Sequence, residues 1–382
     1  MLVSFNDICI IPSIISEIEH RSECSPFTNN GTLPLFTAPM SSVINEQNWT
    51  IFHDNKINTI IPRSVDFEIR KLLMNQTFIA VSLKEFEELI NTYYKDETIY
   101  ICVDIANGHM KKLLTLCEKA KVMYGNRMQL MIGNIANPDT YLEYAKVGID
   151  YIRAGIGTSP VCLTSANNGI HYPMVSLLQE LRFRKISVSC SIEENGREVT
   201  NWHTGKRTIK ETPYKSIPKI IADGGFNNFD QIIKALAIGA DYVMLGRIFA
   251  MSEEACGEVI YKDQIYPVKV DISCLNEEEQ KLFQKMGMSN AYINNSYSLP
   301  YRKYYGMSTK KAQSEFGNTE LKTAEGIETL VPIKYTLAGW CDNFISYLRS
   351  AMSYCNSRTL DQFRQNAKIK QISNNSFNAY YK

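Results

Sequence analysis

Several common features are missing from this chain of 382 residues, and each absence excludes a class of protein. The ten cysteines form no Cys-x-x-Cys pair and do not gather near the five histidines, which argues against zinc and against a disulfide framework. No apolar run approaches the roughly 18 residues of a membrane span, and no basic segment followed by an apolar one begins the chain. A net charge of +1 gives no field for nucleic acid. We therefore expect a soluble, cytoplasmic protein that binds neither nucleic acid nor membrane.

Eight short apolar or β-branched runs recur along the chain, and segments of helical period separate most of them. The runs are Pro34–Ala38, Asn58–Ile61, Thr77–Val81, Ile99–Asp104, Gln129–Gly133, Asp150–Ala154, Pro218–Ala222 and Asp241–Leu245. Strand and helix repeated eight times predicts an α/β protein with a closed (β/α)8 TIM barrel, in one domain over residues 1–382. The alternative is an open doubly wound sheet. The barrel is favoured because no Gly-x-Gly-x-x-Gly fingerprint follows the first run and polar residues end many different strands.

Two polar stretches interrupt this alternation. Residues 186–216 predict a strand-like insertion with a hairpin near Cys190–Arg197, and residues 260–300 carry an acidic helical piece at Asn276–Lys285. Each is too short for a core of its own, so we expect both to decorate the barrel. Two C-terminal segments are expected to form a closing helix and a flexible polar tail, Tyr335–Ser353 and Ser373–Lys382.

The sixth run leads into a loop that holds a single thiol. Gly155 and Gly157 permit tight backbone geometry, Cys162 follows, and the Thr164 hydroxyl comes two residues later. Backbone N–H groups at the end of a buried strand can lower the pKa of an exposed thiol, so Cys162 is a candidate nucleophile. The alternative is that Cys162 is a small buried apolar residue, as most cysteines are.

Polar residues and glycines also end the neighbouring strands. The segments are Asp104-Ile105-Ala106-Asn107-Gly108-His109, Gly133-Asn134, Asp223-Gly224-Gly225 and Gly246-Arg247. In a parallel barrel these ends meet at one mouth, where chemistry is done. Glycine-rich turns after the last two strands expose N–H groups that suit phosphate, and an aspartate beside them suits ribose hydroxyls. Taken singly, Asp104 or Asp223 fits the role of a helix cap equally well.

Together these motifs resemble the IMP dehydrogenase and GMP reductase family over nearly the whole chain. Further matching segments, in family order, are Arg21-Ser22-Glu23-Cys24, Ala38-Pro39-Met40, Tyr305-Gly306-Met307-Ser308 and Glu325-Gly326. The resemblance implies a (β/α)8 barrel that assembles as a homotetramer. The CBS-type regulatory modules that most IMP dehydrogenases insert after the second strand are not expected, because Ile61 passes to Thr77 with one helix between.

The resemblance also implies roles for individual residues. Cys162 would attack C2 of a purine nucleotide, GMP or IMP, while Thr164 and Glu325 move protons and hydride passes between C2 and a nicotinamide. Implied substrate contacts are Met40, Asp223, Gly224, Gly225, Gly246, Arg247, Gly306, Met307 and Ser308. Implied NADPH contacts are Arg63, Asp104, Ala106, Asn107 and Gly108. A monovalent cation such as K+ would be held by the backbone carbonyls of Gly155, Gly157 and Cys162.

The segment after Met307 favours the reductase branch. A dehydrogenase must hydrolyse the covalent intermediate, and the family supplies an arginine for this on a flap; no arginine occurs from Lys303 to Leu348. We therefore expect NADPH-dependent reductive deamination of GMP. The alternatives are IMP dehydrogenase with an unusual base, a related enzyme acting on a modified purine nucleotide, and a nucleotide-binding barrel without turnover.

The chain departs from the family where phosphate is held. Pro160 stands where a serine is expected and offers neither hydroxyl nor N–H. Arg247 follows Gly246 where the family has a small residue, and a charge-assisted contact from it would compensate. Arg63 is expected to stand in for a lysine of the reductases near the cofactor. The altered loop puts the cation site in doubt.

Overall fold

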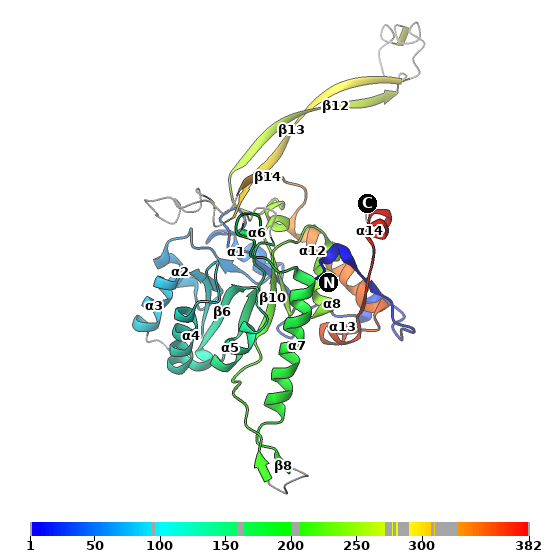
Figure 1. Cartoon of the computed structure of the whole chain (residues 1–382). Helices are drawn as coiled ribbons and strands as arrows, with labels where there is room; N and C mark the ends of the chain where they lie inside the picture. The colour runs from blue at the N-terminus through cyan, green and yellow to red at the C-terminus, as the bar shows by residue number, and fades with distance from the viewer. Residues whose placement is uncertain are drawn as a thin grey trace.

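The computed structural model describes residues 2–93, 96–158, 164–200, 207–271, 277, 280–281, 290–306, 309 and 327–380. Eight parallel strands form a sheet in the order β2, β11, β10, β7, β6, β5, β4, β3 (Figure 1). Their bounds are β2 (Leu35–Thr37), β3 (Ile60–Ile61), β4 (Phe78–Val81), β5 (Ile99–Asp104), β6 (Met128–Ile135), β7 (Tyr151–Ala154), β10 (Lys219–Asp223) and β11 (Tyr242–Leu245). A parallel bridge between Phe36 and Asn58 joins the two outer strands and closes the sheet. The predicted (β/α)8 barrel and its eight strand positions are confirmed.

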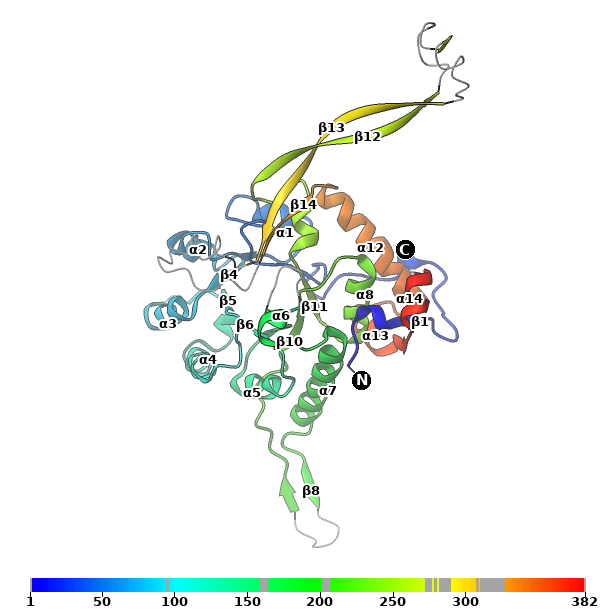
Figure 2. The same ribbon diagram turned by 45° about the horizontal axis from the view of Figure 1, so that its top comes forward.

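Helices surround this barrel (Figure 2). They are α1 (Trp49–Asp54), α2 (Phe67–Leu73), α3 (Leu83–Thr92), α4 (Lys111–Tyr124), α5 (Thr140–Val147), α7 (Met174–Glu193), α8 (Phe229–Ile238) and α12 (Leu337–Tyr354). The start of α3 is fixed by a capping box, in which the Ser82 hydroxyl accepts from Glu85 N and the Glu85 carboxylate accepts from Ser82 N. Only α2 and its connections separate β3 from β4, so no module is inserted there. No helix of the described residues is long and apolar enough to cross a membrane.

Aromatic side chains fill the end of the barrel where the strands begin. Phe36, Phe78, Tyr151 and Tyr242 contact one another with ring centroids 5.0 to 6.1 Å apart, mostly edge to face. The Lys219 ammonium lies 5.8 and 5.7 Å from the centroids of Tyr151 and Tyr242. This layer packs the bottom of the barrel, which leaves the carboxyl ends of the strands to form the site.

The first insertion differs from the prediction. α7 continues to Glu193, so residues 186–193 are helical, and the hairpin lies further on, where β8 (Glu198–Thr200) pairs antiparallel with β9 (Arg207–Ile209). The helix persists because Leu177, Leu178, Leu181 and Val188 keep helical spacing along its buried face. The helical spacing of these apolar residues determines the local structure, although polar residues lie between them. Figure 1 shows α7 and β8 extending below the barrel.

The second insertion is a long antiparallel ribbon of β12 (Val259–Asp271) and β13 (Asn290–Tyr305). β14 (Glu328–Pro332) pairs with the barrel-proximal end of β13. Figures 1 and 2 show the ribbon reaching away from the barrel. Most of the predicted helical piece at Asn276–Lys285 lies outside the described residues.

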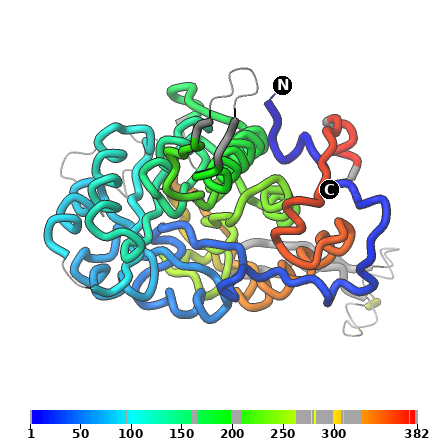
Figure 3. The backbone as a smooth tube through the Cα atoms, turned by 90° about the horizontal axis from the view of Figure 1, so that it is seen from below, coloured from blue at the N-terminus to red at the C-terminus, as the bar shows by residue number. Residues whose placement is uncertain are grey.

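The two ends of the chain lie side by side (Figure 3). β1 (Ile8–Ile11) pairs antiparallel with β15 (Lys368–Gln371). The predicted closing helix is confirmed as α12. The predicted flexible tail instead contains a helix, α14 (Asn374–Tyr380), which follows directly on the paired strand.

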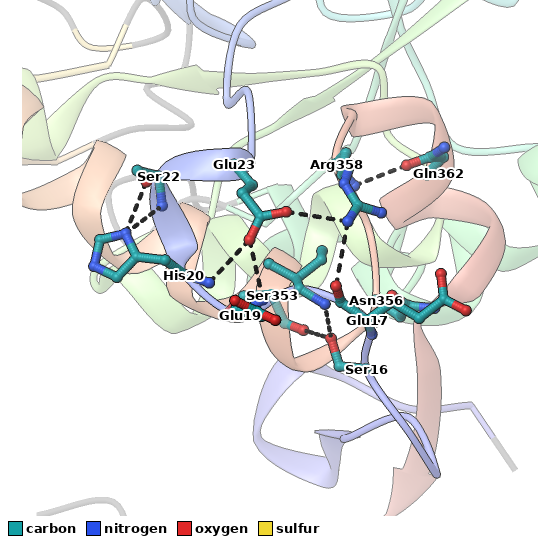
Figure 4. Close-up of polar contacts among 11 residues, drawn as sticks. Ser16, Glu17, Glu19, His20, Ser22, Glu23, Ser353, Asn356, Arg358 and Gln362 are labelled. Carbon is teal, nitrogen blue, oxygen red and sulfur yellow. Dashed lines mark hydrogen bonds and ion pairs between the residues drawn. The ribbon is translucent and has the colours of Figure 1, made fainter.

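A polar network ties the N-terminal segment to the loop before α13 (Leu360–Asn366), as Figure 4 shows. Glu23 Oε1 accepts from the backbone N–H groups of Glu19 and His20, each at 3.0 Å, and Oε2 accepts from Arg358 Nη2 at 3.0 Å. Arg358 Nη2 also donates to Glu17 O at 3.2 Å. The bond from His20 N, followed by that from Arg358, holds the pKa of Glu23 below its ordinary value. The Arg21–Cys24 motif therefore has a structural role here.

A buried arginine anchors the ribbon to the barrel. Arg302 of β13 is 2% exposed, and its Nη1 donates to Ala250 O and Ser252 O, both at 2.6 Å. These carbonyls end the short helix α9 (Arg247–Ala250), where a cation satisfies unpaired acceptors.

We expect Arg302→Met to lower the free energy of unfolding by about 3 kcal/mol, because it strands buried carbonyls. Urea denaturation followed by circular dichroism measures this. Arg302→Lys is the matched control and should recover part of the loss, since its ammonium can reach one or two of the carbonyls. Wild-type stability in Arg302→Met would show that the anchor contributes nothing.

Candidate functional site at the barrel mouth

One arginine gathers two aspartates at the carboxyl ends of the strands. Arg153 of β7 donates from Nη1 to Asp104 Oδ1 at 2.5 Å, at the end of β5. It donates from Nη2 and Nε to Asp223 Oδ2, at the end of β10, at 2.9 and 3.2 Å. Arg153 is 6% exposed and Asp104 5%. The two carboxylates therefore share a single buried guanidinium.

Each aspartate keeps one oxygen without a partner among the described residues. Asp104 Oδ2 is buried and accepts no hydrogen bond there. Asp223 Oδ2 accepts a third bond, from Asn134 Nδ2 at 2.7 Å, whereas no described residue donates to its Oδ1. Buried polar atoms are nearly always hydrogen-bonded, so the unpartnered Asp104 Oδ2 is an exception within the described residues.

The protonation states of Arg153 and Cys102 are fixed by their surroundings. Burial alone would lower the pKa of Arg153, but Asp223 and Asp104 raise it well above its ordinary value, so the guanidinium stays charged. Cys102 Sγ lies 3.7 Å from Arg153 Nη1. Burial raises the pKa of Cys102 to about 12 despite that neighbour, so this thiol is neutral and is not a nucleophile.

Glycines allow the strands to meet this closely. A Cβ on Gly133, whose φ is +149°, would lie 2.5 Å from Arg153 Cβ. A Cβ on Gly155, with φ +131°, would lie 2.4 Å from Asp223 O. Any side chain at either position would push Arg153 or Asp223 out of place.

The predicted cofactor residues lie on the β5 side of the mouth. Arg63 Nη1 donates to Asp104 O at 3.4 Å, and Gly108 N donates to Asn134 O at 2.8 Å. Ala106 and Asn107 are exposed between them. The structure thus brings all five predicted cofactor residues to one edge of the mouth.

The predicted phosphate residues lie on the β10 and β11 side. Gly224 and Gly225 have φ of +95° and +85° and turn the chain after β10. Gly246 ends β11, and a Cβ on it would meet Met40 Sδ at 3.0 Å, so Met40 belongs to the same wall. Arg247 follows as a half-buried side chain with no carboxylate partner among the described residues.

The IMP dehydrogenase / GMP reductase domain family matches residues 71–192 and 206–379, which include Asp104, Arg153 and Asp223. The chain belongs to this family. It is 28% identical over 274 residues to inosine-5'-monophosphate dehydrogenase of Chlorobaculum tepidum, covering 72% of this chain and 45% of that protein. It is 26% identical over 287 residues to GMP reductase of Vibrio cholerae serotype O1, covering 75% and 65%. The chain therefore spans less than two thirds of the length of either relative.

The residues that the family resemblance assigns to chemistry lie mostly outside the described part. Cys162 and Glu325, predicted to be catalytic, lie there, and so do the predicted substrate contacts Met307 and Ser308. Thr164 begins the short helix α6 (Thr164–Asn168), and its side chain is not described. Gly306 follows β13, and its carbonyl accepts from Thr309 Oγ1 at 2.9 Å. The roles of Cys162, Thr164 and Glu325 stay predictions.

The predicted cation site also stays a prediction. Gly155 O accepts from Asn134 Nδ2 at 2.8 Å, and Gly157 O accepts from Ser165 Oγ at 3.2 Å. A cation would have to share these carbonyls with their present donors, and Cys162 lies outside the described residues. Elsewhere in the described part, no group of three or more His, Cys, Asp or Glu residues could hold a metal ion.

Arg153 is the site residue that sequence reasoning missed. It interrupts the otherwise apolar strand Tyr151-Ile152-Arg153-Ala154. A charge inside a buried strand is costly unless it is paired, so its position was a usable signal for two carboxylates nearby.

His109 ties the loops after β5 and β6 together. Its Nε2 accepts from Ala136 N at 3.1 Å, which leaves Nδ1–H to donate to Thr140 Oγ1 at 2.9 Å. Burial lowers the pKa of His109 below 6.5. The loop contact therefore requires the neutral ring.

We expect this contact to be intact above pH 6.5 and lost as pH falls, because a protonated Nε2 cannot accept from Ala136 N. Hydrogen exchange of the Ala136 amide, corrected for its intrinsic pH dependence, should show protection at about pH 7.5 and weaker protection at about pH 4.5, well below the ordinary pKa of histidine. His109→Gln should remove this response, and the exposed control His53→Gln should keep it. Equal protection at both pH values would contradict the assignment.

Proposed function

We propose that this protein is a purine nucleotide oxidoreductase that carries out NADPH-dependent reductive deamination of GMP to IMP. Its family membership supports the substrate class. The observation that carries the proposal is the pair of unpartnered oxygens, Asp223 Oδ1 and Asp104 Oδ2, on opposite sides of one guanidinium. They suit the two ligands that such a reaction brings together.

The binding roles follow from the two sides of the mouth. Asp223 Oδ1 would accept from the ribose hydroxyls of the mononucleotide, and Gly225, Gly246 and Arg247 would hold its phosphate. Asp104 Oδ2 would accept from the dinucleotide, with Arg63 beside it. The residues present fit a nicotinamide dinucleotide because the buried Asp104 oxygen lacks a donor among the described residues. NADPH supplies the hydride when bound.

The chemical steps use this chain's own groups. The Cys162 thiolate bonds to C2 of GMP, and Thr164 with Glu325 delivers a proton to the 2-amino group, since an amine leaves only when protonated. The C2–N bond breaks, ammonia departs, and C2 stays bonded to sulfur as a thioimidate. Hydride addition at C2 then releases the thiolate and IMP.

The arginine-free segment from Lys303 to Leu348 supports the reductase over the dehydrogenase. The similarity to a dehydrogenase at 28% identity makes oxidation of IMP by NAD the second candidate.

Nicotinamide absorbance separates the candidates. We expect absorbance to fall with GMP and NADPH and to stay constant with IMP and NAD. A rise with IMP and NAD alone would identify a dehydrogenase. Nucleotide binding without turnover in either mixture would indicate a non-catalytic nucleotide-binding barrel.

Cys162→Ala is the control for the covalent step. It should abolish turnover while GMP still binds, because the thiol is needed for bond formation and not for ribose or phosphate contacts. Retained turnover would remove the thiol from the mechanism.

We expect Arg247→Ala to raise KM for GMP about 10- to 100-fold through loss of a charge-assisted phosphate contact. Its binding of guanosine, which lacks phosphate, should be unchanged. Arg21→Ala serves as the matched control, because this exposed arginine lies outside the mouth. A KM for GMP equal to wild type would show that Arg247 does not replace the serine missing at Pro160.

A further inference from the structure

The two ligand-facing aspartates are joined through one rigid group. Nη1 of Arg153 holds Asp104, while Nε and Nη2 hold Asp223. A guanidinium is planar, with its N–H directions fixed relative to one another. A shift of one carboxylate that keeps its bonds must therefore turn the guanidinium and shift the other carboxylate.

The surroundings leave this group little freedom. The Arg153 side chain is buried against Gly133, where even a Cβ would clash, and Cys102 lies beside Nη1. Asn134 Nδ2 donates one hydrogen bond to Asp223 Oδ2 and another to Gly155 O. Gly133, Cys102 and Asn134 therefore confine the triad of Asp104, Arg153 and Asp223, in which Asp104 Oδ2 has no partner among the described residues.

We propose that Arg153 is a positioning residue that couples mononucleotide binding at Asp223 to dinucleotide binding at Asp104. The inference rests on the proposed function for the identity of the two ligands. The first ligand to engage a free carboxylate oxygen fixes the shared guanidinium and so fixes the other carboxylate. The second ligand then binds to a carboxylate that is already ordered, and it therefore binds more tightly. By linkage, the effect is equal in both directions.

Lysine at this position separates charge from geometry. Arg153→Lys keeps one positive charge between the carboxylates but has a single ammonium in place of the fork. Each ligand alone should still find a carboxylate, whereas the rigid link between them is lost. If Arg153 had a purely structural role, Arg153→Lys would instead weaken the binding of both ligands. The ratio between the affinity for GMP alone and the affinity for GMP with NADP+ present would then stay unchanged.

The test is isothermal titration of the full chain with GMP, without and with saturating NADP+, which cannot reduce GMP. In the wild type, NADP+ should tighten GMP about tenfold, and GMP should tighten NADP+ equally. In Arg153→Lys this factor should fall to about one, with binary affinities changed about threefold or less. Lys121→Arg is the matched control, since Lys121 forms a buried ion pair with Asp150 at the other end of β7. In Lys121→Arg, NADP+ should still tighten GMP binding about tenfold.

A second measurement needs no variant and decides the question if Arg153→Lys does not fold. Hydrogen exchange on the wild type with GMP alone should slow at Ile105, whose N–H bonds Gly133 O beside Asp104. Protection by GMP that is confined to the Asp223 side would overturn the inference. So would titrations in which NADP+ does not tighten GMP binding to the wild type, or tightens it equally in Arg153→Lys. Failure of GMP, IMP, NADP+ and NAD all to bind the wild type would instead overturn the proposed function.

Discussion

The arrangement of the mouth depends on the buried Arg153 guanidinium between the buried carboxylate of Asp104 and the half-buried carboxylate of Asp223. Removing such charges from water costs several kcal/mol per ion, so the triad persists only with short, well-directed bonds. Arg153 provides these because its fork reaches Asp104 and Asp223 from different nitrogens. Asp104 Oδ2 has no partner among the described residues, and no described residue donates to Asp223 Oδ1. A group this costly to bury is poorly explained by stability alone, which is why we assign it to binding.

Ion pairs at the opposite end of the barrel have a different geometry and a different role. Asp150 and Asp241 each precede a strand and accept a backbone N–H from the neighbouring strand, Leu130 and Ile220, both at 2.7 Å. Each also pairs with a lysine from an outer helix, Lys121 or Lys185. These carboxylates hold register between strands and helices. The barrel thus has one end closed by aromatic rings and an opposite end where polar residues gather around Arg153.

Most of the fold could be predicted because apolar runs of strand length, separated by helical periods, allow few topologies. All eight barrel strands follow from that pattern. Residues 186–193 were assigned wrongly because polar residues hid the spacing that keeps α7 helical to Glu193. The helix α14 was missed because its residues are polar and it follows the β1–β15 pairing, which joins segments about 360 residues apart in sequence.

Only those features of the site that a single residue indicates by its place in the chain could be predicted from the sequence. Asp104 and Asp223 end their strands, and that position made them candidates, although each fits the role of a helix cap equally well when taken singly. The link between them was not predictable, because a shared guanidinium is a contact among three strands, and sequence spacing carries no information on which strands are adjacent. Arg153 sits on β7, between β6 and β10 in the sheet, and spans from Asp104 on β5 to Asp223 on β10. Only the order of strands around the barrel makes it the common partner.

Two of the departures of this chain from its family, Pro160 and Arg247, concern the expected phosphate contacts. Arg247 lies on the β11 side of the mouth, whereas hydrogen bonds connect Asp104, Asn134, Arg153 and Asp223 into one group beside it. A phosphate contact can move from a serine hydroxyl to an arginine because phosphate offers several equivalent oxygens and tolerates more than one direction of approach. The ion triad has no such latitude, since a Cβ at Gly133 or Gly155 already clashes with it. We therefore expect substitutions to be tolerated at the phosphate contacts and not in the triad of Asp104, Arg153 and Asp223.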